Sequence, residues 1–321
     1  PTVDPTPTLL DIERTHLLFV NAHFKPFASV GFEYNKVNPL NRPASLSNSS
    51  TTDLRFPIPQ FGDFFHDMCL HLVLIAPTLT ITGTPYPAGR WAEYPGERVM
   101  KKTEFNVNGN MLDSYTGECY SVYRNHLLGN NKINGYSRMM GQQIPRKGKL
   151  RQSTGAIADT VESYQSQINI LEGAQTYKRY MDDLELYIPL MFWFNKDPRL
   201  AIPSVSIPHG NRYLDITLSS RDDLIMTDTR TNNNTLTIGS VNISKCQLYI
   251  NNIFVNPEVH DIFIKRIGFS LIRVHRIQEL TCNNNDDDLL LNNMKWPIEC
   301  MIIGAKMNRN KIINNYHHLF T

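Results

Sequence analysis

The residues with the clearest chemical potential form the short cluster His66-Asp67-Met68-Cys69-Leu70-His71. Imidazole and thiolate groups are the usual ligands of zinc in proteins. On a strand, however, His66 and His71 lie five positions apart and point to opposite faces, whereas Cys69 and His71 share one face. No second group of ligands in the sequence completes a tetrahedral set, and His317-His318 is a weaker candidate. We therefore interpret these residues as packing residues and expect no metal site.

The basic stretch Gly141–Leu150 (GQQIPRKGKL) invites comparison with a phosphate-binding loop. Six residues separate Gly141 from Gly148-Lys149, and Leu150 stands where such a loop needs Ser or Thr to hold magnesium. A solvated loop is the favoured interpretation. The residues that could contact nucleic acid are Arg146, Lys147, Lys149 and Arg151. They lack interleaved aromatic residues and the net charge is only +2, so no sequence-specific nucleic-acid binding is expected.

Other signs of catalysis are weak. Asp182-Asp183 and Asp286-Asp287-Asp288 lack the alternating ligands and glycine of a calcium loop. The sequence contains no G-x-S-x-G motif, and its five cysteines are widely spaced without a C-x-x-C pair. We therefore expect reduced thiols, no catalytic residues, no cofactor and no enzymatic activity. The N-x-S/T sequons are at Asn48, Asn233 and Asn242.

Two features concern topology rather than chemistry. No stretch approaches 18 apolar residues, so no transmembrane segment is expected. The start, Pro1-Thr2-Val3-Asp4-Pro5, has no initiator Met and no signal-peptide pattern. We interpret it as an internal position of a longer chain.

The elements that must position these residues are short β-branched and aromatic runs separated by Pro and Gly. These runs are His71–Ile75, Thr103–Val107, Leu186–Phe194, Tyr213–Leu218, Cys246–Val255, Ile267–His275 and Pro297–Gly304. Asn108-Gly109 is a tight-turn signal between strands, and Pro257–Lys265 predicts one short helix. Apolar residues make up 41% of the chain, enough for a packed core. The pattern indicates an all-β protein.

The run that ends at Phe194 predicts more detail. Alternation along a strand places Phe192 and Phe194 on one face and Trp193 on the other. The prolines that should then keep the chain extended and exclude helix are Pro198, Pro203 and Pro208. Long polar segments, above all Arg124–Gln167 and Arg221–Ser244, are expected to be surface loops.

Several segments, in a fixed order, resemble the major capsid proteins of nucleo-cytoplasmic large DNA viruses. The most specific is Leu190–Leu218 (LMFWFNKDPRLAIPSVSIPHGNRYLDITL), and Glu93–Tyr115 carries a similar Y-P-G-x-R…V-N-G element. The remaining matching segments are Asn21–Val37, Phe56–Met68, Leu248–His275 and Lys295–Gly304. The resemblance covers nearly the whole chain and is closest to the African swine fever virus and faustovirus branch.

The resemblance implies a double jelly roll, the first sandwich complete with long loop insertions and the second only begun. Residues 1–265 would form the N-terminal jelly roll, and residues 266–321 the opening strands of a second, truncated one. Three copies would form a pseudo-hexagonal capsomer of an icosahedral shell, with Arg124–Gln167 and Arg221–Ser244 as candidate tower or intersubunit loops. The expected partners are other copies of the chain, neighbouring capsomers, minor and penton capsid proteins and an assembly chaperone. The expected locations are the virion and, during assembly, the host cytoplasm.

Three alternatives use a similar fold. A minor or penton capsid protein would contain a single jelly roll. A receptor-binding or carbohydrate-binding β-sandwich would present exposed aromatic residues and calcium ligands. A cupin-type enzyme would need clustered His and Glu ligands inside a barrel, and no such cluster is evident in the sequence.

Overall fold

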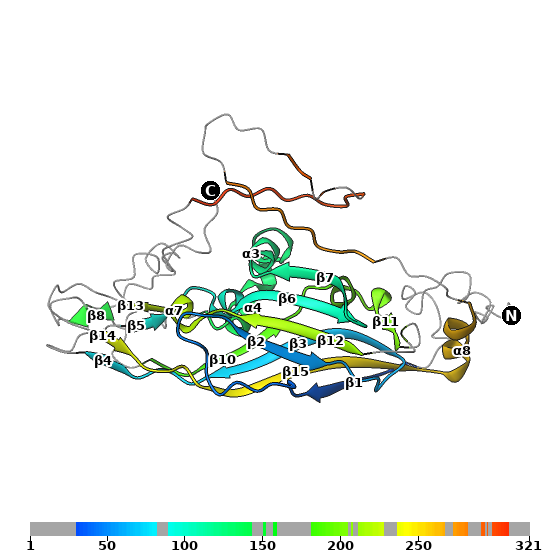
Figure 1. Ribbon diagram of the computed structural model, residues 1–321, viewed down its shortest axis with the longest axis horizontal. Helices are drawn as coiled ribbons and strands as arrows, with labels where there is room; N and C mark the ends of the chain where they lie inside the picture. Colours follow the sequence, from blue (N-terminus) through cyan, green and yellow to red (C-terminus); the bar gives the residue numbers. More distant parts are fainter. Residues whose placement is uncertain are drawn as a thin grey trace.

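The computed structural model describes residues 30–81, 89–142, 150–151, 157–158, 181–204, 207, 211–227, 236–266, 272–281, 290–292, 294 and 297–307. The core of the described part is formed by two antiparallel sheets that face each other (Figure 1). The first, called the β15 sheet, has the order β1 (Val30–Val37), β15 (Ile243–Val255), β3 (Phe64–Leu74) and β10 (Leu184–Pro189), with β11 (Ile202–Pro203) also paired to β3. The second, called the β12 sheet, has the order β2 (Thr52–Pro57), β12 (Arg212–Leu218), β6 (Met100–Val107) and β7 (Asn110–Thr116).

The order in which the chain visits the two sheets defines the topology. β1 lies in the β15 sheet, β2 in the β12 sheet and β3 in the β15 sheet again; β6 and β7 then pair in the β12 sheet. The chain returns to the β15 sheet at β10, to the β12 sheet at β12, and finally to the β15 sheet at β15. This alternation between two four-strand paths is that of a jelly roll. The expected all-β fold is confirmed, and the first sandwich is complete.

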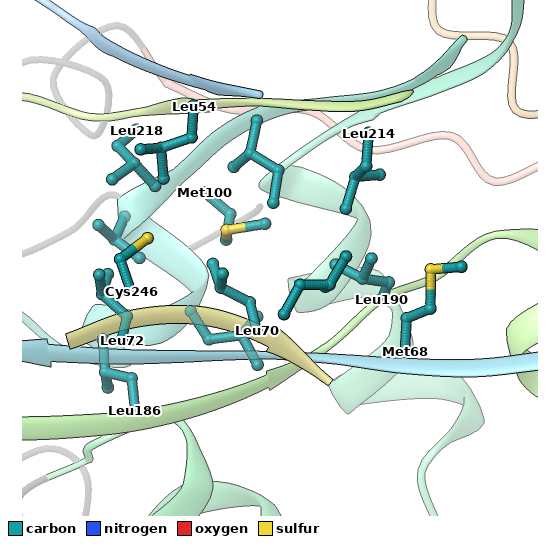
Figure 2. Close-up of a cluster of buried hydrophobic side chains, with 14 of the residues drawn as sticks. Leu54, Met68, Leu70, Leu72, Met100, Leu186, Leu190, Leu214, Leu218 and Cys246 are labelled. Atoms are coloured by element: carbon teal, nitrogen blue, oxygen red, sulfur yellow. The ribbon is translucent and has the colours of Figure 1, made fainter. Parts of the chain in front are cut away.

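Strand periodicity explains why the core forms between the sheets. In β12, Leu214, Ile216 and Leu218 alternate with more exposed residues, so one side of the strand is apolar. Leu70 and Leu72 of β3 lie in the opposite sheet, and Figure 2 shows them with Leu214 and Leu218 in the layer between the sheets. Each fully buried Leu side chain contributes roughly 1.5–3 kcal/mol, so this layer is the main source of stability.

Short helices and small ladders occupy the connections. The helical segments are α2 (Pro95–Val99), α3 (Glu118–Val122), η1 (Tyr123–Leu127), η2 (Asn130–Lys132), α4 (Ile133–Met139), α6 (Trp193–Lys196), η3 (Pro198–Leu200), α7 (Arg221–Leu224) and α8 (Pro257–Arg266). The two-stranded ladders pair β13 (Ile225–Thr227) with β5 (Gly89–Trp91), β14 (Leu236–Ile238) with β4 (Leu79–Ile81), and β8 (Leu150–Arg151) with β9 (Ile157–Ala158).

Two local predictions are confirmed. Asn108 and Gly109 have φ angles of 52° and 81° and join β6 to β7, as expected for an Asn-Gly turn. Pro257 begins the predicted short helix, α8.

The prediction of one strand over Leu186–Phe194 is wrong at its C-terminal end. β10 ends at Pro189, although the N–H of Leu190 still donates to the carbonyl of Met68 on β3 (2.9 Å). Asn195 then accepts a hydrogen bond from the N–H of Phe192 (3.1 Å) and donates to the carbonyl of His66 (2.7 Å), which favours a helical turn at α6. Phe192, Trp193 and Phe194 are consequently all buried in one aromatic cluster instead of serving two faces.

The prediction that the following prolines exclude helix is also wrong at Pro198. This residue begins the 3-10 turn η3, where its missing N–H costs nothing and its fixed φ suits a first helical position. Pro203 does lie in an extended segment, β11, and Pro208 lies outside the described residues.

The strands expected in the last part of the chain are not formed where the structure describes it. Residues 272–281 and 297–307 carry no regular secondary structure. A strand needs a neighbouring strand to satisfy its backbone groups, and none of the described segments pairs with them. The division into two domains at residue 265 therefore stays a prediction.

Candidate functional site

The histidine and cysteine cluster lies on β3, but its members contact different parts of the protein. The Nδ1 atom of His66 bonds to the carbonyl of Phe194, whereas the Nε2 atom of His71 lies 2.9 Å from Oε1 of Glu185. Burial, together with the charge of Asp67, raises the pKa of Cys69 to about 12, so this thiol stays protonated at neutral pH. The described residues contain no group of three or more His, Cys, Asp or Glu side chains arranged for a metal ion.

Aromatic rings cross the outer face of the β15 sheet. Tyr187 stacks on His71, with ring centroids 4.4 Å apart and planes 6° apart, and Tyr249 lies 6.2 Å from His71 on the neighbouring strand. On the edge strand β1, the Tyr34 hydroxyl donates to Asp67 across 3.1 Å. The rings therefore extend over β1, β15, β3 and β10, and we call this set the aromatic face.

Hydrogen bonds set the charge state at the β10 end of the aromatic face. Oε1 of Glu185 accepts bonds from His71 and from the hydroxyl of Tyr187, the latter at 3.0 Å. These two bonds, in that order, lower the pKa of the Glu185 carboxyl. The same contact raises the pKa of Tyr187. The sequence pointed to His71, but it gave no sign that β10 would supply its partners.

A second polar site lies beneath the helices that follow β7. Glu97, in α2, is buried and accepts hydrogen bonds from Ser121 (3.0 Å), Arg124 (2.9 Å) and Tyr136 (3.0 Å). The guanidinium of Arg124 also lies 3.8 Å from the ring centre of Tyr94. Burial and the Glu97 carboxylate both raise the pKa of Tyr136. We call these residues the Glu97 network; it attaches α3, η1 and α4 to the sandwich.

The Glu97 network changes the interpretation of the predicted loop Arg124–Gln167. Its first part, up to Gln142, forms η1, η2 and α4 and carries the buried anchors Tyr136 and Met140. A buried polar side chain needs a fixed partner, and Glu97 supplies it from within the same subunit. This part is therefore packed against its own subunit, and its role in a tower or between subunits stays a prediction. Most of the remainder lies outside the described residues.

The second predicted loop, Arg221–Ser244, contains α7, β13 and β14 as well as undescribed residues. The Arg221 guanidinium donates to the carbonyl of Ile238 across 2.8 Å, which joins the two ends of this segment. A role of the segment in a tower or between subunits stays a prediction.

The last part of the chain contacts the β12 sheet at β7. The buried Asp113 carboxylate accepts a bond from the backbone N–H of His275 (2.8 Å) and lies 3.0 Å from its Nδ1 atom. Lys306 reaches Glu118 of α3 across 3.0 Å. Figure 1 shows residues 272–281 and 297–307 passing beside β7 and α3, on the side of the sandwich away from β1 and β15. No sequence pattern revealed these contacts.

The remaining candidates serve structure or lie outside the described residues. Asp183 accepts a bond from the N–H of Ala76 (2.8 Å), and the carbonyl of Asp182 accepts one from the Trp91 indole (2.9 Å). The sequon residues Asn48 and Asn242 are exposed. No helix within the described residues is long and apolar enough to cross a membrane. Candidates of which no side-chain structure is described are Arg146, Lys147, Lys149, Arg151, Asn233, Asp286, Asp287, Asp288, His317 and His318.

Comparisons with known proteins agree with this architecture. Residues 41–256 match the family model described as major capsid protein N-terminus. Hexon protein p72 of African swine fever virus (strain Badajoz 1971 Vero-adapted) is 32% identical, over 98% of this chain and 68% of that protein. The major capsid protein of Paramecium bursaria Chlorella virus 1 is 26% identical, over 51% of this chain and 28% of that protein.

Solved structures give the same result. The faustovirus major capsid protein superposes with a TM-score of 0.58 and 29% identity, covering 84% of this chain and 62% of that chain. VP54 of PBCV-1 superposes with a TM-score of 0.52 and 17% identity, covering 76% of this chain and 47% of that chain, and supports the fold alone. The present chain thus spans less than two thirds of the faustovirus chain. With a family match over most of the sandwich and the strand order of a jelly roll, the chain belongs to the major capsid proteins of large DNA viruses, of which it contains the N-terminal family region.

Proposed function

We propose that this chain is a structural subunit of an icosahedral virus shell and that three copies assemble into a pseudo-hexagonal capsomer. The observation that carries the proposal is the complete jelly roll followed by a segment that continues along β7. Upright sandwiches of this kind place flat sheet faces side by side, which suits repeated lateral contacts. The proposed role is structural and not catalytic.

We infer that residues 266–321 begin a second jelly roll. Their described part exposes many large apolar side chains, although it is held to the first sandwich at His275 and Lys306. These exposed side chains are Ile272, Ile277, Leu280, Leu290, Leu291, Ile298, Met301, Ile302, Ile303 and Met307. Apolar residues this dense on a surface indicate that other structure covers them, and the strands of a second sandwich would do so.

The proposed partners follow from this role. Each subunit would contact other copies within the capsomer and neighbouring capsomers in the shell. Minor and penton capsid proteins would complete the assembly, and a chaperone would protect exposed strand edges and apolar surface before assembly. The virion is the proposed final location, and the host cytoplasm the place of assembly.

The experiment is the solution mass of the polypeptide that carries this sequence, measured by light scattering on a sizing column. A mass three times that of the subunit, stable on dilution, is the expected result. A strict monomer at high concentration, also when the protein is produced together with the viral chaperones, would contradict the capsomer. It would favour a minor capsid or receptor-binding role.

A further inference from the structure

The two outer faces of the sandwich differ in chemistry. On the outer face of the β12 sheet, polar groups are paired: Arg55 with Asp215 (2.6 Å) and Thr217 with Asp53 (2.8 Å) across neighbouring strands, and Lys102 with Glu104 (2.6 Å) along β6. Such pairs keep a sheet face hydrated. The aromatic face of the β15 sheet instead exposes large rings.

The aromatic face has the composition of a protein interface. Tyr34 is 57% exposed and Tyr187 is 39% exposed, although both hydroxyls are already bonded to carboxylates of their own subunit. The carboxylates of Asp67, on β3, and Glu185, on the edge strand β10, are thus engaged, and Lys36 lies on the opposite edge strand, β1. Enrichment in tyrosine with charged groups at the edges is typical of interfaces between proteins.

His71 provides a second, independent observation. Its ring is 4% exposed, and its Nδ1 atom is buried without a hydrogen-bond partner in the described structure, while Nε2 is occupied by Glu185. A buried polar atom of this kind is normally satisfied, so an unpartnered one calls for an additional group. The ring lies between Tyr187 and Tyr249, within the aromatic face.

The size of the face suits a protein partner. The four strands have 8, 13, 11 and 6 residues. At about 4.8 Å between strands and about 3.4 Å per residue, they present about 600 Å² in projection. Standard interfaces bury about 800 Å² on each partner. The relief of the side chains raises the accessible area above the projected one, so this face supplies most of one such patch.

The position of the aromatic face identifies the occupant as another copy of the chain. In a closed ring, each subunit uses two different surfaces, one toward each neighbour. The side of the sandwich at β7 and α3 is taken by residues 272–281 and 297–307 of the same chain, which contact Asp113 and Glu118. The aromatic face lies on the other side of the sandwich (Figure 1) and is left for the next subunit.

We propose that the outer face of β1, β15, β3 and β10 binds a second copy of this chain within the capsomer, with Tyr34 and Tyr187 as its anchors. The neighbouring copy would cover the two rings. This inference rests on the proposed capsomer and names the surface that builds it.

Hydroxyl-radical footprinting of the unmodified full-length protein tests the surface without any substitution. Oxidation of Tyr34 and Tyr187 should fall at least about fivefold in the trimer relative to subunits dissociated by dilution, because buried aromatic anchors exclude water. Tyr213, on the outer face of the β12 sheet, is the internal control and should change by less than twofold. Unchanged oxidation of Tyr34 and Tyr187 in the trimer would overturn the proposal.

Substitution supplies a second test. In Tyr34→Lys combined with Tyr187→Lys, each new amine stands beside the carboxylate that the replaced hydroxyl bonds, so the subunit should fold while the interface loses both aromatic anchors. Circular dichroism checks the fold. We expect the trimer dissociation constant to rise about 100-fold or more, against less than threefold for the matched control Tyr213→Lys.

The outcomes separate this inference from the proposed function. A trimeric parent with an equally stable trimeric double variant would overturn the aromatic face as the contact and leave the capsomer intact. Protection of the two tyrosines only in assembled shells would do the same, because it would assign the face to contacts between capsomers or to another protein. A parent that is monomeric at every concentration would overturn both.

Discussion

The Glu97 network gives the sharpest stability prediction, because one buried carboxylate holds three donors from different helical segments. In Glu97→Gln, the side chain keeps its shape, but the hydrogen bonds from Ser121, Arg124 and Tyr136 lose their charged acceptor. The Arg124 guanidinium, 9% exposed, then keeps its charge without a counter-ion. Removing one partner of a buried ion pair typically costs about 3–5 kcal/mol. Glutamine still accepts hydrogen bonds, and the ring of Tyr94 still faces the Arg124 cation. We therefore expect Glu97→Gln to lower the free energy of unfolding by about 2–4 kcal/mol.

The assay is urea unfolding followed by tryptophan fluorescence, combined with hydrogen exchange resolved by peptide. The loss of protection should be concentrated in residues 118–140, because the network attaches these helices and not the sheets. The matched control is Glu104→Gln, which breaks the more exposed pair with Lys102 (2.6 Å) and should cost less than about 1 kcal/mol.

A double substitution isolates the cause. Adding Arg124→Met to Glu97→Gln removes the uncompensated charge and should raise the free energy of unfolding again by at least about 1 kcal/mol. The reasoning fails if Glu97→Gln costs no more than Glu104→Gln, or if exchange increases evenly over both sheets.

Three further predictions follow from the core and the backbone. Phe105→Ala should lower the free energy of unfolding in urea by about 3–5 kcal/mol. The reason is that the Phe105 ring contacts four other aromatic rings, those of Phe65, Phe192, Trp193 and Phe194, at centroid distances of 5.3–6.3 Å. A decrease below about 1 kcal/mol would contradict a packed cluster. Burial raises the pKa of the Cys246 thiol from 9.0 to about 12, so the unfolded chain loses this proton first. The free energy of unfolding should therefore fall between about pH 9 and pH 12, by up to about 1.4 kcal/mol per pH unit. Cys246→Ala should remove this contribution, as measured by comparing urea unfolding midpoints across that pH range. Gly117→Ala should abolish soluble expression or reduce the melting temperature strongly, because a Cβ there would lie 2.5 Å from the Met100 carbonyl oxygen. The control is Gly135→Ala in α4, where a Cβ meets open space, and it should leave the melting temperature unchanged or raise it.

The aromatic run shows where prediction from local sequence failed. Leu186–Phe194 is apolar and β-rich, so period-two alternation was the natural expectation. The actual end of β10 depends on Asn195, which bonds to the carbonyl of His66 on a strand far away in sequence. Such a contact exists only after the chain has folded, and a pattern over neighbouring residues does not contain it.

The candidate sites show the same limit. The sequence drew attention to His71, but its interpretation depended on ligands that were sought nearby along the chain. The partners that matter, Glu185 and Tyr187, are more than 100 residues away and come within reach because β10 pairs with β3. The burial of Glu97 could not be predicted, since a single Glu in a short Pro-Gly segment carries no signal of burial.

The all-β class, the Asn108-Gly109 turn, the helix that begins at Pro257 and the family could all be predicted from the sequence, because they depend on short-range patterns or on matching segments in order. The strand pairs, the face with exposed rings and the contact of Asp113 with His275 required the folded structure. Strand pairing and the burial of charge are long-range, because each depends on groups that the fold brings together from distant positions. The surfaces proposed for assembly belong to this second kind.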